Sequence, residues 1–172
     1  MKLDAMNLYI LRHGLAVEQG TAGYANDADR PLTPKGERKL CLIAEAMEEL
    51  ELSFDLILSS PYKRAGQTAE IVADVLKMSK KVELTPTLEP GGSSKELIEM
   101  VKSIKPAPEE VMLVGHEPYL SSLISLLVAG DTSVQVEMKK GGLCKLSVDS
   151  LKHGRCARLE WLLTPRQMRL MA

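Results

Sequence analysis

Two histidines and an arginine stand directly after short apolar runs, where they could bind and attack a phosphoryl group. Arg12 and His13 follow the run 7–11, and His116 follows the run 111–114 after one glycine. A neutral imidazole can attack phosphorus when a hydrogen bond holds its other ring nitrogen. A single histidine in a folded protein is more often structural. The pair therefore predicts chemistry only if both rings reach the same site.

A second arginine has a context that suits an anion. Arg64 lies in the segment 59–68, which follows the apolar run 54–58 and contains a helical pattern. The free N–H groups and the dipole of a helix N-terminus favour anions, and an arginine in the first turn adds a two-pronged phosphate donor. Taken alone, Arg64 would be interpreted as a solvated charge on a surface helix.

The elements that would position these residues alternate between strand and helix patterns. This alternation predicts an α/β fold with three layers, α/β/α, and a mostly parallel sheet that ends in a C-terminal strand hairpin. The expected strands are 7–11, 54–58, 82–84, 111–114, 143–148 and 157–163, and the expected helices begin near 34, 61, 93 and 119. Ligands of open α/β sheets bind at the carboxyl ends of the strands, so His13, Ser59 and His116 should meet at one edge.

Size and composition limit the possible functions. The chain has 172 residues, which predicts a single domain over 1–172. With 22 Lys+Arg against 23 Asp+Glu and 3% aromatic residues, it has no overall basic field and few stacking groups. We therefore expect no nucleic acid and no membrane partner. No apolar run approaches the roughly 18 residues of a membrane span.

Cysteines and metal ligands lack the spacing of known sites. The three cysteines, Cys41, Cys144 and Cys156, are far apart, which argues against disulfides and zinc and favours a cytoplasmic protein with reduced thiols. The chain has no phosphate-binding P-loop, no dinucleotide fingerprint and no nucleophilic serine elbow. Any reaction should therefore proceed without a metal and without a cofactor.

Three of these motifs resemble the histidine phosphatase superfamily, whose fold is that of phosphoglycerate mutase. Residues 12–14 resemble its R-H-G signature, 59–68 its S-x-x-x-R-x-x-Q-T motif, and 115–116 its second catalytic histidine. The segments 29–33 (D-R-P-L-T) and 114–118 (V-G-H-E-P), with the small size, are similar to the short SixA-type phosphohistidine phosphatases.

The resemblance implies roles for individual residues. His13 would be the nucleophile and become transiently phosphorylated, while Arg12, Arg64 and His116 would neutralise the phosphoryl oxygens. Arg30 either reaches the same pocket or makes a structural contact between its loop and a helix. No metal or cofactor is implied.

One position departs from the superfamily pattern. Many members carry a general-acid glutamate in the loop after the third strand, but Pro90 stands at that position here and Glu89 is shifted by one. Glu89 is thus either a displaced general acid or a loop residue. A weak acid favours a leaving group that departs easily, such as the imidazole of phosphohistidine, over an alkoxide.

Three functions are consistent with these residues. The first is a phosphatase that removes phosphate from phosphohistidine on a protein, for example a histidine-containing phosphotransfer domain. The second is a small-molecule phosphomonoesterase with Glu89 or Glu117 as acid. The third is a non-catalytic phosphoprotein-binding module, which would not need a nucleophile. The short segments between motifs leave little room for a lid, which favours the first.

Overall fold

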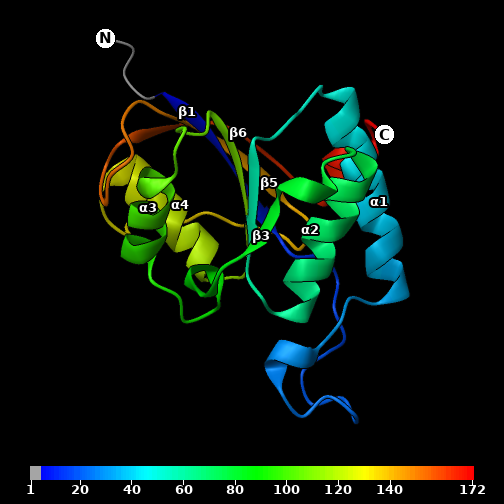
Figure 1. Cartoon of the computed structure of the whole chain (residues 1–172). Helices are drawn as coiled ribbons and strands as arrows, with labels where there is room; N and C mark the ends of the chain where they lie inside the picture. The colour runs from blue at the N-terminus through cyan, green and yellow to red at the C-terminus, as the bar shows by residue number, and fades with distance from the viewer. Residues whose placement is uncertain (1–4) are drawn as a thin grey trace.

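The computed structural model describes residues 5–172 and contains one six-stranded sheet between two helical layers (Figure 1). The strands are β1 (Met6–Arg12), β2 (Leu56–Ser59), β3 (Val82–Leu84), β4 (Glu110–Gly115), β5 (Leu143–Val148) and β6 (Ala157–Leu163). Their order in the sheet is β3-β2-β4-β1-β5-β6. The strands β3, β2, β4 and β1 run parallel to one another. The strands β5 and β6 form an antiparallel hairpin, as the sequence predicts, and β5 pairs antiparallel with β1.

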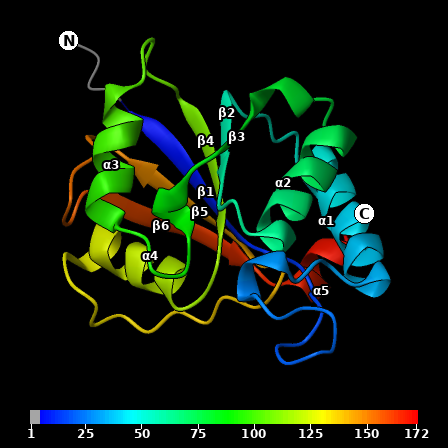
Figure 2. The same cartoon turned by 60° about the horizontal axis from the view of Figure 1, so that its bottom comes forward.

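The helices cover the sheet on both faces. They are α1 (Pro34–Glu49), α2 (Lys63–Val75), α3 (Ser94–Ser103), α4 (Tyr119–Ala129) and α5 (Pro165–Arg169), with single 3-10 turns at Asp27–Asp29, Ser79–Lys81 and Pro86–Leu88. Both views place α3 and α4 on one face and α1, α2 and α5 on the other (Figures 1 and 2). The three-layer α/β/α prediction is therefore confirmed. No helix in the described part of the chain is long and apolar enough to cross a membrane.

Two apolar cores follow from the alternation of side chains along β1. Leu8 and Ile10 point into the core beneath α3 and α4, whereas Tyr9 and Leu11 point into the core beneath α1 and α2. Successive side chains of a strand face opposite sides, so a strand covered on both faces must be apolar throughout. This explains why the strands before the candidate residues appear as uninterrupted apolar runs.

The helix starts match their sequence signals, with one addition. Thr33 caps α1 by accepting a hydrogen bond from the Gly36 N–H, and Ser93 caps α3 from the Glu96 N–H in the same way. The short helix α5 was not predicted, although Thr164 and Gln167 form a complete capping box at its start. The second strand begins at Leu56 rather than at residue 54.

Two helical glycines allow a matched test of the packing between α1 and the loop after β1. A Cβ on Gly36 would lie 2.1 Å from the backbone oxygen of Leu15, whereas a Cβ on Gly66 in α2 would meet no atom within 4 Å. Gly36→Ala should therefore lower the free energy of unfolding by about 1–3 kcal/mol. Gly66→Ala should raise it by about 0.5–1 kcal/mol, because alanine has the higher helix propensity.

Urea denaturation of both variants measures these changes through the shift of the midpoint at constant slope. A Gly36→Ala protein as stable as the wild type would mean that the loop carrying Leu15 yields freely, contrary to the packing described.

Candidate active site

The register of the parallel strands brings both histidines to the same edge of the sheet. Arg12 pairs with Gly115 across β1 and β4, and the His13 N–H donates to the Gly115 carbonyl over 3.0 Å. The residues that follow, His13 and His116, therefore lie side by side, with ring centroids 5.1 Å apart. From β2, the N–H of Ser60 bonds the carbonyl of Val114 over 3.0 Å and adds a hydroxyl to the group.

His13 is held in the tautomer that a nucleophile requires. Its Nδ1 lies 2.7 Å from the carbonyl oxygen of Gly14, which can only accept, so Nδ1 carries the proton. The lone pair of Nε2 then faces Arg64, whose Nε–H lies 3.3 Å away. Burial lowers the pKa of His13 to about 3, against the opposing effect of the Gly14 hydrogen bond. The ring is therefore neutral near pH 7.

His116 presents a buried ring nitrogen to the site. Its Nε2 lies 2.8 Å from the Ser60 hydroxyl, which also accepts a hydrogen bond from the Tyr62 N–H. When the Ser60 O–H donates to Nε2, the neutral ring carries its proton on Nδ1. Among the described residues this buried Nδ1 has no hydrogen-bond partner. Burial, followed by the charge of Arg64, lowers the pKa of His116 to about 4.

Arg64 lies at the centre of the site because α2 begins directly after β2. It is the second residue of the helix and only 4% exposed, and its guanidinium stacks over the Tyr62 ring at 5.2 Å. Thr68, one turn later, donates to the Arg64 carbonyl and accepts from the Gly14 N–H. Gln67 likewise accepts from the Leu32 N–H. The Q-T part of the motif thus ties α2 to the loop after β1.

Arg12 extends the site toward the hairpin. Its NH1 donates to the carbonyl of Met138 over 2.8 Å, while its buried Nε has no hydrogen-bond partner in the described chain. Burial lowers the pKa of Arg12, although the nearby Glu117 carboxylate opposes this. Within the described residues the Arg12 Nε–H is thus a buried donor without a partner, which suits an oxygen of a phosphoryl group. The unpartnered Nδ1 of His116 suits such an oxygen in the same way when it carries the ring proton.

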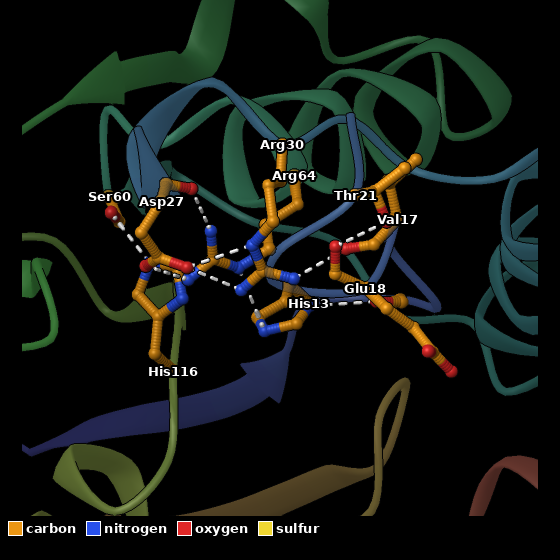
Figure 3. Close-up of polar contacts among 10 residues, drawn as sticks. His13, Val17, Glu18, Thr21, Asp27, Arg30, Ser60, Arg64 and His116 are labelled. Carbon is orange, nitrogen blue, oxygen red and sulfur yellow. Dashed lines mark hydrogen bonds and ion pairs between the residues drawn. The ribbon is translucent and has the colours of Figure 1, made fainter. Parts of the chain in front are cut away.

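Asp27 connects Arg64 with Arg30, as Figure 3 shows. Its Oδ2 accepts from Arg64 NH2 over 2.9 Å, and its Oδ1 accepts from Arg30 Nε over 2.8 Å and from Arg30 NH2. Burial alone would raise the pKa of Asp27, but the hydrogen bonds from Arg30 and Arg64 outweigh it and lower the pKa. The carboxylate is therefore an anion near neutral pH.

Arg30 contacts residues of its own segment and is linked to the candidate site through one of them. Its guanidinium donates to the carbonyl of Val17, which is a contact within the loop, and to Asp27, which contacts Arg64. Arg30 is therefore connected to the edge of the site through Asp27. Within residues 5–172, Arg30 makes no direct hydrogen bond to His13 or His116.

Glu89 lies apart from this network. It follows the 3-10 turn Pro86–Leu88, and its backbone groups bond Pro86 and Gly92. Within the described residues its carboxylate makes no hydrogen bond or ion pair, and it is not among the charges that shift the pKa of His13 or His116. The loop itself is close to the site, because the Leu88 carbonyl packs against Gly115.

Sequence reasoning missed Asp27, Ser60 and Tyr62. Ser60 and Tyr62 lie inside the recognised motif 59–68, and their positions directly after a strand could have indicated them. Asp27 belongs to a polar loop without periodicity, and its only signal is the three-residue spacing to Arg30. Within residues 5–172, no three metal-binding side chains of His, Cys, Asp or Glu gather as a metal site would require.

Comparison with known proteins identifies the family of the chain. Residues 8–89 match the model of the histidine phosphatase superfamily (branch 1). An uncharacterized protein of Picosynechococcus sp. is 38% identical over 82% of this chain and 84% of its own length. The phosphohistidine phosphatase SixA of Escherichia coli K12 is 25% identical over 96% of this chain and 98% of its own length.

The fold agrees with these relatives. A solved structure of the protein histidine phosphatase SixA complexed with tungstate superposes with a TM-score of 0.77 at 27% identity, covering 94% of this chain and 98% of that one. The chain belongs to the histidine phosphatase superfamily. The family and the site together support phosphatase activity, that is, a hydrolase that acts on phosphoryl groups.

Arg64 allows a direct test of the geometry of the site. Its three nitrogens contact His13 and two different oxygens of Asp27, a fork that the single nitrogen of lysine cannot reproduce. Arg64→Lys should lower kcat/KM on an aryl phosphate at least about tenfold, equivalent to roughly 1.4 kcal/mol of transition-state stabilisation.

Arg38→Lys, at an exposed position of α1, serves as the control and should stay within about twofold of the wild type. If Arg64→Lys matched this control, a point charge would suffice and the fork would have no function.

Proposed function

We propose that the protein is a phosphohistidine phosphatase that acts on a protein, with His13 as the nucleophile. Arg12, Arg64 and His116 would bind the phosphoryl oxygens, and no metal or cofactor takes part. The observation that carries the proposal is the Asp27 carboxylate, which lies at the site and is ion-paired with both Arg30 and Arg64. A carboxylate held by two guanidinium groups is a poor proton donor, which suits a leaving group that needs no proton from the enzyme.

Phosphohistidine is such a substrate. Its ring can be protonated at the nitrogen that does not carry phosphorus. The Nε2 of His13 would then attack, forming a P–N bond to His13 while the P–N bond to the substrate breaks. The electron pair of the broken bond goes to the substrate ring, which leaves as neutral imidazole. An alkyl phosphate would instead release an alkoxide, which requires a general acid.

The second step uses the hydrogen bond between His13 and Gly14. Phospho-His13 retains its Nδ1 proton, because the Gly14 carbonyl accepts it over 2.7 Å. Water attacks phosphorus, a P–O bond forms and the P–N bond breaks, so that His13 returns as the neutral tautomer and the water protons stay on inorganic phosphate. The same Gly14 contact thus serves both the attack and the release.

Asp27 would also favour this substrate electrostatically. Its side chain is 35% exposed, and of its four lone-pair sites three are used by Arg30 and Arg64. An anion at this position stabilises a protonated imidazole ring, a positive charge that a phosphate monoester lacks. The nearly full-length similarity to SixA, a phosphohistidine phosphatase, adds support for the same substrate class.

The proposal is tested by three substrates and three variants. The substrates are a phosphorylated histidine-containing phosphotransfer domain, an aryl phosphate and an alkyl phosphate, all measured as kcat/KM. Asp27→Asn should lower the preference for the phosphoprotein about tenfold, the magnitude of one charge-assisted hydrogen bond. Asp29→Asn is the matched control, because within the described residues the Asp29 carboxylate accepts a hydrogen bond only from Asn26. This variant should leave kcat/KM unchanged for every substrate. Glu89→Gln should alter phosphoprotein turnover by no more than a few-fold.

Other outcomes assign the activity differently. Equal losses on all substrates in Asp27→Asn would reduce Asp27 to a support for Arg64. Collapse of phosphoprotein turnover in Glu89→Gln would identify Glu89 as the general acid. Turnover of alkyl monoesters but not of the phosphoprotein by the wild type would establish the small-molecule phosphomonoesterase instead.

A further inference from the structure

A groove with a volume of about 460 Å³ lies beside the active site, and six of its ten lining residues are cations, beside Leu15, Ile43, Thr164 and Pro165. We call it the cationic groove. Its charged residues come from the end of β1, from α1, from the turn before β5 and from α5. Figure 2 shows α1 and α5 side by side. The six cations are Arg12, Lys39, Lys139, Lys140, Arg166 and Arg169, and no acidic residue lines the groove.

This concentration of charge is unusual for a chain with net charge −1. Among the described residues the only ion pair made by these cations joins Lys139 to Glu137 over 3.9 Å, and both side chains are mostly exposed. Six like charges around one concavity repel each other and lower the stability of the folded state. Solvated lysines on a surface need no function, but solvation alone does not gather cations from four separate elements.

The cationic groove is continuous with the site. Arg12 lines the groove and directly precedes His13. The turn that carries Lys139 and Lys140 is hydrogen-bonded to the same segment, because the Gly141 N–H donates to the carbonyls of Arg12 and His13. An anion in the groove would therefore belong to a molecule that also reaches the nucleophile.

The walls of the cationic groove are preformed. The Gly142 N–H closes the turn onto the Lys139 carbonyl over 2.7 Å, and the capping box of Thr164 and Gln167 fixes the start of α5. Arg169 donates to the Pro165 carbonyl within this helix. The backbone is held while the long side chains of Lys140 and Arg166 remain exposed, which suits several carboxylates on a surface better than one tightly enclosed ion.

We infer that the cationic groove docks an acidic surface of the phosphoprotein substrate, next to its phosphohistidine. The inference rests on the proposed function and adds to it a surface that selects the protein substrate. Its occupant is a surface rich in Asp and Glu, since these side chains complement the six cations. Pairs of this kind at the rim of an interface steer association and make it dependent on salt.

The double variant Lys140→Glu/Arg166→Glu tests this inference. Both side chains are exposed and neither is among the groups that would contact the phosphoryl group. Lys80→Glu/Lys81→Glu is the matched control, because it makes the same change of charge on exposed residues before β3, at the opposite edge of the sheet. Both proteins are assayed with the phosphorylated phosphotransfer domain and with an aryl phosphate, at low salt and at 0.5 M NaCl.

At low salt we expect KM for the phosphoprotein to rise about tenfold or more in the groove variant, as expected when an attractive surface becomes repulsive. Its turnover of the aryl phosphate, which also reports correct folding, should stay within about threefold, because a small substrate would contact Arg12 at the inner end of the groove but not Lys140 or Arg166. The control should behave as wild type with both substrates. High salt should bring the wild type close to the groove variant, since it shortens the Debye length to a few ångströms.

Failure of the inference is distinguishable from failure of the proposed function. If the wild type cleaves the phosphoprotein and the groove variant does so equally well, the cationic groove does not dock the substrate. If both substrates weaken equally, its charge acts on the phosphate site rather than on a protein. If the wild type cleaves the aryl phosphate but not the phosphoprotein, the proposed function fails, and the docking role fails with it.

Discussion

The parallel pairing of β1 with β4 is the constraint on which the rest of the site depends. Arg12 and Gly115 are partners in this register, so His13 and His116 leave the sheet together and at the same edge. A shift by one residue would move every apolar side chain of β1 to the wrong core, which makes the register costly to change. The two cores that hold the sheet therefore also set the distance between the two histidines.

Burial then determines what these residues can do. Removing imidazoles from water disfavours their charged form, so His13 and His116 are neutral at physiological pH, and both lie near the ion pair of Arg64 with Asp27. A neutral imidazole thus lies beside a buried guanidinium. The same desolvation that disfavours the protonated ring leaves the nitrogen lone pair of His13 available, and it strengthens the attraction of Arg64 for an anion.

Much of this could be predicted from the sequence, because apolar runs mark strands and strand ends mark the site. His13, His116 and Arg64 follow such runs and were found with the sheet, the hairpin and most helix starts. Asp27 was not found, because it pairs with Arg64 from 37 residues away through a loop whose path no periodicity encodes. The cationic groove could not be predicted for a similar reason, since it joins residues from four elements that only the folded chain brings together.

The most direct measurement concerns the bond that His13 would form with phosphorus. Rapid acid-free quenching during turnover, followed by mass spectrometry of peptides, would locate the phosphoryl group on the enzyme. The account predicts an acid-labile, base-stable phosphoramidate on His13 that forms and decays at rates compatible with turnover, and its loss together with activity in a folded His13→Ala protein. A phosphoryl group on another residue, or near wild-type turnover without His13, would contradict it.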